Sequence, residues 1–221
     1  GLGQLIEIEG GAQQDRVVGG TQALCEAVAA ALQARVVLGT SVQAIDHSAP
    51  DEVVVTHAAG RHRARAVVVA LPPHLAGRIE YTPRLPTRRQ ELLQRWNMGA
   101  TIKTVCRYDA AHWRERGFSG EAVTDGPLSV VFDNTSARGA PALVGFVVGA
   151  EAERWSALSQ ADRRARALAE MERIFDVPAT SAVGYADHDW RSDPFSGGCP
   201  VATLPPGGIS RYADTWRDPV G

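Results

Sequence analysis

The stretch "GATIKTVCRY", residues 99–108, is typical of a β-strand but has a lysine near its middle. Ile102, Thr104, Val105 and Tyr108 are β-branched or aromatic residues, which favour a pleated, half-buried backbone. A lysine is almost never fully buried, so Lys103 either faces water or has a function. Most strand lysines lie on a solvated face, and the residue type alone favours that interpretation.

The segments around this strand predict a second sheet with helices beside it. Strands are expected at "GPLSVVFDNTS" (126–136) and "APALVGFVVGA" (140–150). Helices are expected at "LPTRRQELLQRWN" (85–97), which has proline near its start, and at "SQADRRARALAEMERIF" (159–175). In the latter, Ser159 is expected to cap the helix, with Asp162 at the capping-box position. This region therefore mixes strands and helices.

The first part of the chain predicts one helix and three β-segments. The apolar spacing of "TQALCEAVAAALQA" (21–34) predicts the helix, with Leu24, Val28 and Leu32 on one face. The β-segments are "RVVLGTSVQAIDH", "DEVVVTHAAG" and "RHRARAVVVALPP", which begin at residues 35, 51 and 61. In the third, "AVVVAL" (66–71) is apolar without alternation, as in a strand covered on both faces. The proline-rich sequence that follows indicates a boundary near Tyr81. The expected fold class is α/β, with mixed α+β character.

Composition limits the classes of partner and of compartment. The chain has 221 residues, 44% of them hydrophobic, and a net charge of -2, so neither nucleic acid nor a membrane surface is an expected partner. The three cysteines are odd in number and far apart, which argues against a disulfide framework and against a paired-cysteine metal site. A cytoplasmic location and no metal are therefore expected.

Residue motifs by themselves identify no chemistry. The sequence contains no HExxH, GxSxG or Walker A pattern, the usual signatures of zinc hydrolysis, serine acyl transfer and P-loop phosphoryl transfer. His188 and Asp189 could be a base and its orienting group, but neighbouring strand residues point to opposite faces. Cys199 alone is more typical of a buried or loop thiol than of a nucleophile.

Four longer stretches, taken in order, resemble the flavin-containing amine oxidases, the family of the monoamine oxidases and their bacterial relatives. They are "RVVGGTQALCEAVAAAL" (16–32), "AVVVALPPHLAGRIEYTPRLP" (66–86), "WNMGATIKTVCRYDAAHW" (96–113) and "DWRSDPFSGGCPVATLPPGGISRYADTWRDPVG" (189–221). The resemblance covers only the middle to C-terminal portion of a family member. It implies part of a two-domain FAD-dependent fold: residues 1–80 as a partial FAD-binding domain, 81–195 as the substrate-binding domain and 196–221 as the return segment.

The family's strand-GxGxxG-helix for the FAD pyrophosphate has no counterpart in this sequence, and the "GTE"-type segment that contacts the flavin is also missing. The chain is therefore expected to be a fragment: a truncated or proteolysed product, or one chain of a protein cut in two.

The resemblance also implies site residues. Lys103 matches the active-site lysine that reaches toward flavin N5 through a water, and Trp190 matches a tryptophan near it, with core packing as the competing interpretation. Cys199 matches the cysteine that some members bond covalently to the flavin. Pro200 departs from the family, because the animal enzymes have a substrate-cage tyrosine there. Further cofactor-binding positions are Val42, beside the adenine, and the strand end at Ala70, Leu71 and Pro72.

The resemblance implies an enzyme that oxidises a small amine to an imine, then to an aldehyde or ketone plus ammonia, with FAD as cofactor and oxygen reduced to hydrogen peroxide. An L-amino-acid oxidase or a desaturase of the same superfamily is an alternative. A third possibility is a catalytically incomplete module that only folds. A homodimer or a complementing chain is a possible partner, and the particular amine is left open.

Overall fold

The computed structural model describes residues 10–11, 14–32, 36–136, 139–212 and 214–220. The chain divides into two compact units, residues 1–41 and residues 42–221. The domain boundaries expected near residues 80 and 195 stay predictions.

The first unit contains the helix α2 (Gln22–Leu32), which confirms the helix expected from residue 21. The last two residues of the expected segment, 33 and 34, lie outside the described residues. No residue of α2 is buried, and the side chains of Leu24, Val28 and Leu32 are 56%, 60% and 46% exposed. Helical spacing was thus enough to predict this element without any buried face.

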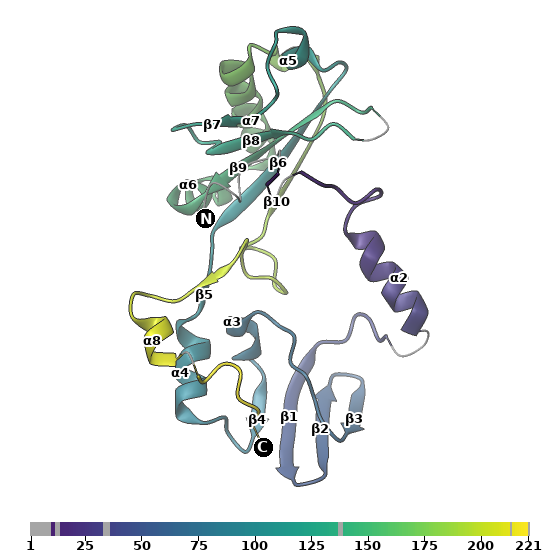
Figure 1. Cartoon of the computed structure of the whole chain (residues 1–221), viewed down its shortest axis with the longest axis vertical. Helices are drawn as coiled ribbons and strands as arrows, with labels where there is room; N and C mark the ends of the chain where they lie inside the picture. Colours follow the sequence, from purple (N-terminus) through teal and green to yellow (C-terminus); the bar gives the residue numbers. More distant parts are fainter. Residues whose placement is uncertain (1–9, 12–13, 33–35, 137–138, 213, 221) are drawn as a thin grey trace. The chain divides into compact units, whose positions relative to one another are not determined.

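The second unit begins with a four-stranded sheet in the order β3-β2-β1-β4 (Figure 1). Its strands are β1 (Val42–Ala49), β2 (Glu52–His57), β3 (Gly60–Ala64) and β4 (Glu80–Thr82). The first three form an antiparallel meander, whereas β4 runs parallel to β1. Strands therefore form in all three of the expected β-segments.

The apolar run at residues 66–71 was predicted as a doubly covered strand, and that prediction is wrong. Strand β3 ends at Ala64, and residues 66–70 have no regular secondary structure. Val68 is 89% exposed. A β-strand requires a neighbour to satisfy its backbone N–H and C=O groups, and none of the described strands pairs with this run. Apolar composition therefore did not suffice to make a strand.

A five-stranded antiparallel sheet has β6 (Thr101–Tyr108) between β10 (Ala182–Asp189) and β9 (Ala142–Val148) (Figure 1). Beyond β9 lie β8 (Val130–Asp133) and the short β7 (Ala122–Val123). The strands expected at 99–108, 126–136 and 140–150 are confirmed. Strand β6, which contains Lys103, thus pairs with a neighbouring strand on both edges.

Helices cover one face of this sheet: α6 (Gly149–Ser156) and α7 (Gln160–Phe175). The Ser159 hydroxyl accepts a hydrogen bond from the Asp162 amide, which confirms the predicted helix cap. The core beneath contains alternate residues of β6, together with apolar residues of both helices: Ile102, Cys106, Tyr108, Trp155, Leu168, Met171 and Phe175. Strand alternation therefore directs the remaining β6 side chains, Lys103 among them, to the opposite face.

The remaining elements are α3 (Pro73–Ala76), α4 (Thr87–Arg95), β5 (Asn97–Met98), α5 (His112–Glu115), the 3-10 helix η2 (Ala179–Ser181), β11 (Ala202–Thr203) and α8 (Gly208–Tyr212). Of these, α4 and β5 connect the two sheets, and the others lie between strands of one sheet or follow β10. The helix predicted at 85–97 is confirmed as α4.

The C-terminal segment returns onto α4. Tyr212 donates its hydroxyl to Glu91 (2.9 Å), and Trp96 meets Trp216 edge to face with 5.4 Å between ring centroids. These contacts join segments more than a hundred residues apart in the sequence.

Candidate functional site

Lys103 lies on the face of the five-stranded sheet opposite α6 and α7, and it is exposed. The strand register places it between Phe146 of β9 and His188 of β10. Its Nζ lies 5.8 Å from the centroid of the Phe146 ring, a cation–π distance. Among the described residues it forms no ion pair. The strand thus presents a cation beside an aromatic ring, with its charge available to another group.

Aromatic side chains continue at the end of β10 and directly after it. The rings of His188 and Trp190 meet edge to face with 4.3 Å between centroids, and Trp190 is 36% exposed. The carboxylate of Asp189 instead accepts a hydrogen bond from the Ser156 hydroxyl of α6 (2.6 Å). His188 and Asp189 therefore do not form a base with its orienting group, as strand alternation led us to expect.

The backbone of Cys199 is hydrogen-bonded to residues at the beginning of β6. Its N–H donates to the Gly99 carbonyl (3.0 Å), and its own carbonyl accepts from the Thr101 hydroxyl (3.1 Å). Two glycines permit this close approach. A Cβ on Gly99 would lie 2.6 Å from the Cys199 oxygen, and one on Gly198 would lie 2.4 Å from the Gly99 oxygen. Cys199 is thereby brought near Lys103, although the two are 96 positions apart in the sequence.

The Cys199 thiol is influenced by the charge on Lys103. Burial raises the pKa of Cys199, whereas the Thr101 hydroxyl and the positive charge of Lys103 act in the opposite direction. Cys106, in the core of the sheet, has its pKa raised to about 12 by burial. The positive charge of Lys103 thus favours the thiolate form of Cys199.

Replacing Lys103 with methionine is expected to raise the pKa of Cys199 further, because the stabilising charge is lost. At pH 8 less thiolate is then present, so alkylation of Cys199 by iodoacetamide should slow by about threefold to tenfold. Peptide mass spectrometry of the full-length protein would follow each cysteine separately, and Cys25, exposed on α2, serves as the internal control. An unchanged Cys199 rate beside an unchanged Cys25 rate would show that Lys103 does not act on the thiol.

The "ALPP" segment reaches this region through α3. Ala70 and Leu71 are exposed, and Pro72 immediately precedes the helix. One turn on, the ring of His74 packs against Gly197, two residues before Cys199. Val42 lies elsewhere: it begins β1 and pairs with His57 in the four-stranded sheet. Of the residues named from the sequence, the structure therefore groups Lys103, Trp190 and Cys199 most clearly.

Several residues of this region were not singled out from the sequence: Phe146, Thr101, His74 and Gly197. Strand alternation could have placed Phe146 on one face of its strand, but not opposite Lys103, because that depends on the register. The Gly197-Gly198 pair was the available signal for a close backbone approach.

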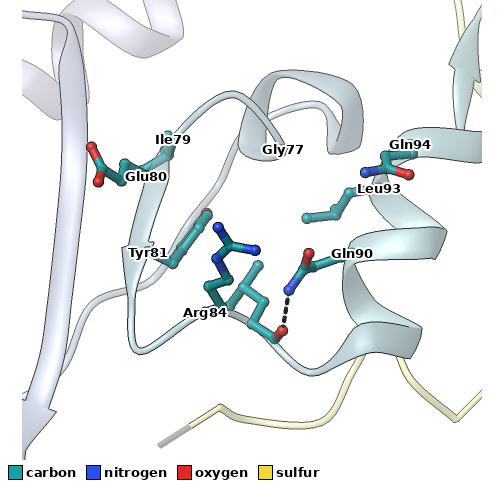
Figure 2. Close-up of a pocket in the computed structure, with 9 residues that line it drawn as sticks. Gly77, Ile79, Glu80, Tyr81, Arg84, Gln90, Leu93 and Gln94 are labelled. Atoms are coloured by element: carbon teal, nitrogen blue, oxygen red, sulfur yellow. Dashed lines mark hydrogen bonds between the residues drawn. The ribbon is translucent and has the colours of Figure 1, made fainter.

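A separate pocket of about 260 Å³ lies between β4 and α4. Figure 2 shows Tyr81 and Arg84 on one side of it and Gln90 and Leu93 on the other. The Gln90 amide donates to the Leu85 carbonyl. None of the site residues expected from the sequence lines this pocket.

Comparisons with known proteins point in one direction. A family model described as "Flavin containing amine oxidoreductase" matches residues 1–221. The chain is 36% identical over 222 residues to "Probable flavin-containing monoamine oxidase A" of Dictyostelium discoideum, covering 99% of this chain and 49% of that protein. It is 34% identical over 207 residues to "L-amino acid dehydrogenase" of Synechocystis, and the match covers 92% of this chain and 43% of that protein.

A solved structure also resembles the fold. Wild-type putrescine oxidase bound to putrescine superposes with a TM-score of 0.88 at 33% identity, covering 93% of this chain and 46% of that one. The chain therefore spans about half the length of the proteins it matches.

Among the described residues, no helix is both long and apolar enough to cross a membrane.

Proposed function

Because the chain belongs to the family of flavin containing amine oxidoreductases, we propose that the full-length protein is an FAD-dependent amine oxidase. In this reaction an amine becomes an imine, which water hydrolyses to an aldehyde or ketone, and oxygen is reduced to hydrogen peroxide. FAD is the family's cofactor, and the homologues are oxidoreductases. The proposal rests above all on the cationic Lys103, which lies unpaired among the described residues and beside a thiol and aromatic rings.

The residues of this face fit a flavin. A flat, electron-accepting ring needs aromatic neighbours and a positive charge where negative charge develops, and Trp190, Phe146 and Lys103 supply these groups. The glycines at 99 and 198 leave no side chain between Cys199 and β6. Bound FAD supplies the chemistry itself, by taking a hydride equivalent from the carbon next to the amine nitrogen.

We assign the chain's own groups the following roles. The Lys103 ammonium holds a water by hydrogen bonding and stabilises developing negative charge, as a compact cation with three N–H donors does. Trp190 bounds the site and helps to exclude water. Val42 and the segment Ala70, Leu71 and Pro72 would hold the cofactor through their backbones. Cys199 would adjoin the bound cofactor, and Pro200 cannot form the aromatic wall that a tyrosine provides.

A second candidate function is the oxidation of an amino acid. It is favoured by the relative named L-amino acid dehydrogenase, which matches at a similar identity. The two candidates differ in substrate: an amino acid brings a carboxylate into the site, whereas a simple amine does not. A third candidate is that the 221-residue chain is a folded module without activity. The amine oxidase proposal also includes the domain ranges, with residues 81–195 as the substrate-binding domain and 196–221 as the return segment. It includes a homodimer or a complementing chain as a partner.

The test uses the purified full-length protein. We expect flavin absorbance in the visible range, and peroxide release with a panel of primary amines that includes putrescine but not with L-amino acids. Release of FAD after denaturation would show non-covalent binding, whereas flavin on the Cys199 peptide would show the bond. Activity with L-amino acids alone would favour the second candidate. A colourless protein that stays colourless with added FAD would overturn the proposal.

A further inference from the structure

His74 is a half-buried histidine whose ring nitrogens, Nδ1 and Nε2, have no hydrogen-bond partner among the described residues. It lies on the short helix α3, directly after the proline pair at residues 72 and 73. Burial lowers the pKa of His74, and the positive charge of Arg78 acts in the same direction. Both influences disfavour the imidazolium form, which would place a charge beside Arg78 without a partner among the described residues.

The ring packs edge-on against Gly197. A Cβ on Gly197 would lie 2.2 Å from Nε2 of His74 and 3.1 Å from both Cδ2 and Cε1. Gly197 also has a φ of +65°, a region that side chains other than glycine rarely adopt. Position 197 is thus restricted twice, by its own backbone and by the imidazole beside it.

The turn that contacts His74 is continuous with Cys199. On one side, the Gly197 amide donates to the Asp193 carbonyl oxygen (2.8 Å), and the Ser196 amide donates to the Asp193 carboxylate (2.9 Å). On the other side, the Cys199 amide donates to Gly99. The turn is therefore held at both ends by hydrogen bonds, and in its middle by contact with the imidazole.

We propose that His74 is a positioning residue for Cys199: its imidazole supports the turn at Gly197 and so keeps the Cys199 backbone hydrogen-bonded to the beginning of β6. Any effect of this support on catalysis rests on the proposed function, because Cys199 would adjoin a flavin only if the protein binds FAD. The support itself is independent of any cofactor. It explains why a histidine without hydrogen-bond partners among the described residues occupies this place: the ring acts by its shape.

The test is hydrogen exchange of the full-length protein, followed on peptides that cover residues 195–201. Because loss of the ring removes the support, His74→Ala should speed exchange of the Cys199 amide by about tenfold while leaving β6 protected. His74→Phe keeps a ring at this place and should restore nearly the wild-type rate. His62→Ala, on the exposed strand β3, is the matched control and should change nothing in this peptide.

Gly197→Ala provides the second arm, since its methyl group would push the turn off the ring. Alone it should speed exchange to a similar extent. Combined with His74→Ala, it should add less than it does alone, because the clash with the ring is gone and only the strain of the positive φ at position 197 remains. Unchanged exchange in folded His74→Ala, no rescue by His74→Phe, or multiplication of the two effects would each overturn the proposal. Exchange is measured without substrate, so a failure of the proposed oxidase activity leaves this result intact.

Discussion

Replacing Lys103 with methionine in the full-length protein is expected to slow amine-dependent turnover by about 100- to 1000-fold, the usual cost of removing one preorganised electrostatic group. Methionine keeps the length of the side chain and removes only its charge and its N–H donors. FAD should remain bound, because the backbone contacts proposed for Val42 and the "ALPP" segment are unaffected. Peroxide release and the visible flavin spectrum measure the two effects separately.

Arg107→Met is the matched control for this prediction. Arg107 lies on the same open face of β6, four residues along, where it is exposed and opposite Gly184. The substitution removes one positive charge from the same strand at a greater distance from Cys199 and Trp190, so turnover should change by less than about twofold. Equal losses of turnover in Lys103→Met and Arg107→Met would mean that turnover depends on the total positive charge of this face and not on Lys103 in particular.

Replacing Arg163 with methionine is expected to lower the free energy of unfolding by about 3–5 kcal/mol, because it leaves a buried carboxylate without its partner. The Arg163 guanidinium donates from Nε and Nη2 to the two oxygens of Asp187, at 2.7 and 3.1 Å. The Asp187 side chain is only 3% exposed, and the Tyr185 hydroxyl also donates to it (2.8 Å). Denaturant titration of the purified variant measures the loss.

The control is an ion pair in open solvent. Arg63 and Glu52, on the hairpin of β2 and β3, pair at 2.9 Å with side chains 72% and 40% exposed. Arg63→Met should cost less than about 1 kcal/mol. Similar losses for the two arginine variants would contradict the distinction between buried and exposed pairs.

The Asp187 pair also predicts the sign of a pH effect. Burial alone would raise the pKa of Asp187, but the hydrogen bonds from Arg163 and Tyr185 outweigh it and hold this pKa below its usual range. The stabilisation is therefore present above about pH 4, the value for an unfolded aspartate, and is lost as the pH falls through the lowered native pKa. In Arg163→Met, stability should depend less on pH in that acidic range.

Local sequence patterns predicted most of the secondary structure. Helices α2, α4 and α7 have apolar residues at helical spacing, and Ser159 caps α7 as expected. Strand β6 was evident from its β-branched residues. The run at residues 66–71 was mistaken for a strand, because its apolar composition carries no information on whether another strand lies beside it. Pairing is a property of two segments, and only the fold shows both.

The sequence by itself determined strands β6, β8 and β9 of the five-stranded sheet, the alternation that separates Lys103 from the core, and the resemblance that named Lys103, Trp190 and Cys199. The tertiary structure decided which groups meet: Phe146 and His188 across from Lys103, Cys199 against Gly99, and His74 beneath Gly197. The physical reason is the range of the interactions. Helical spacing and strand alternation act over a few neighbouring residues, whereas strand register and close backbone approach join segments that are tens of residues apart.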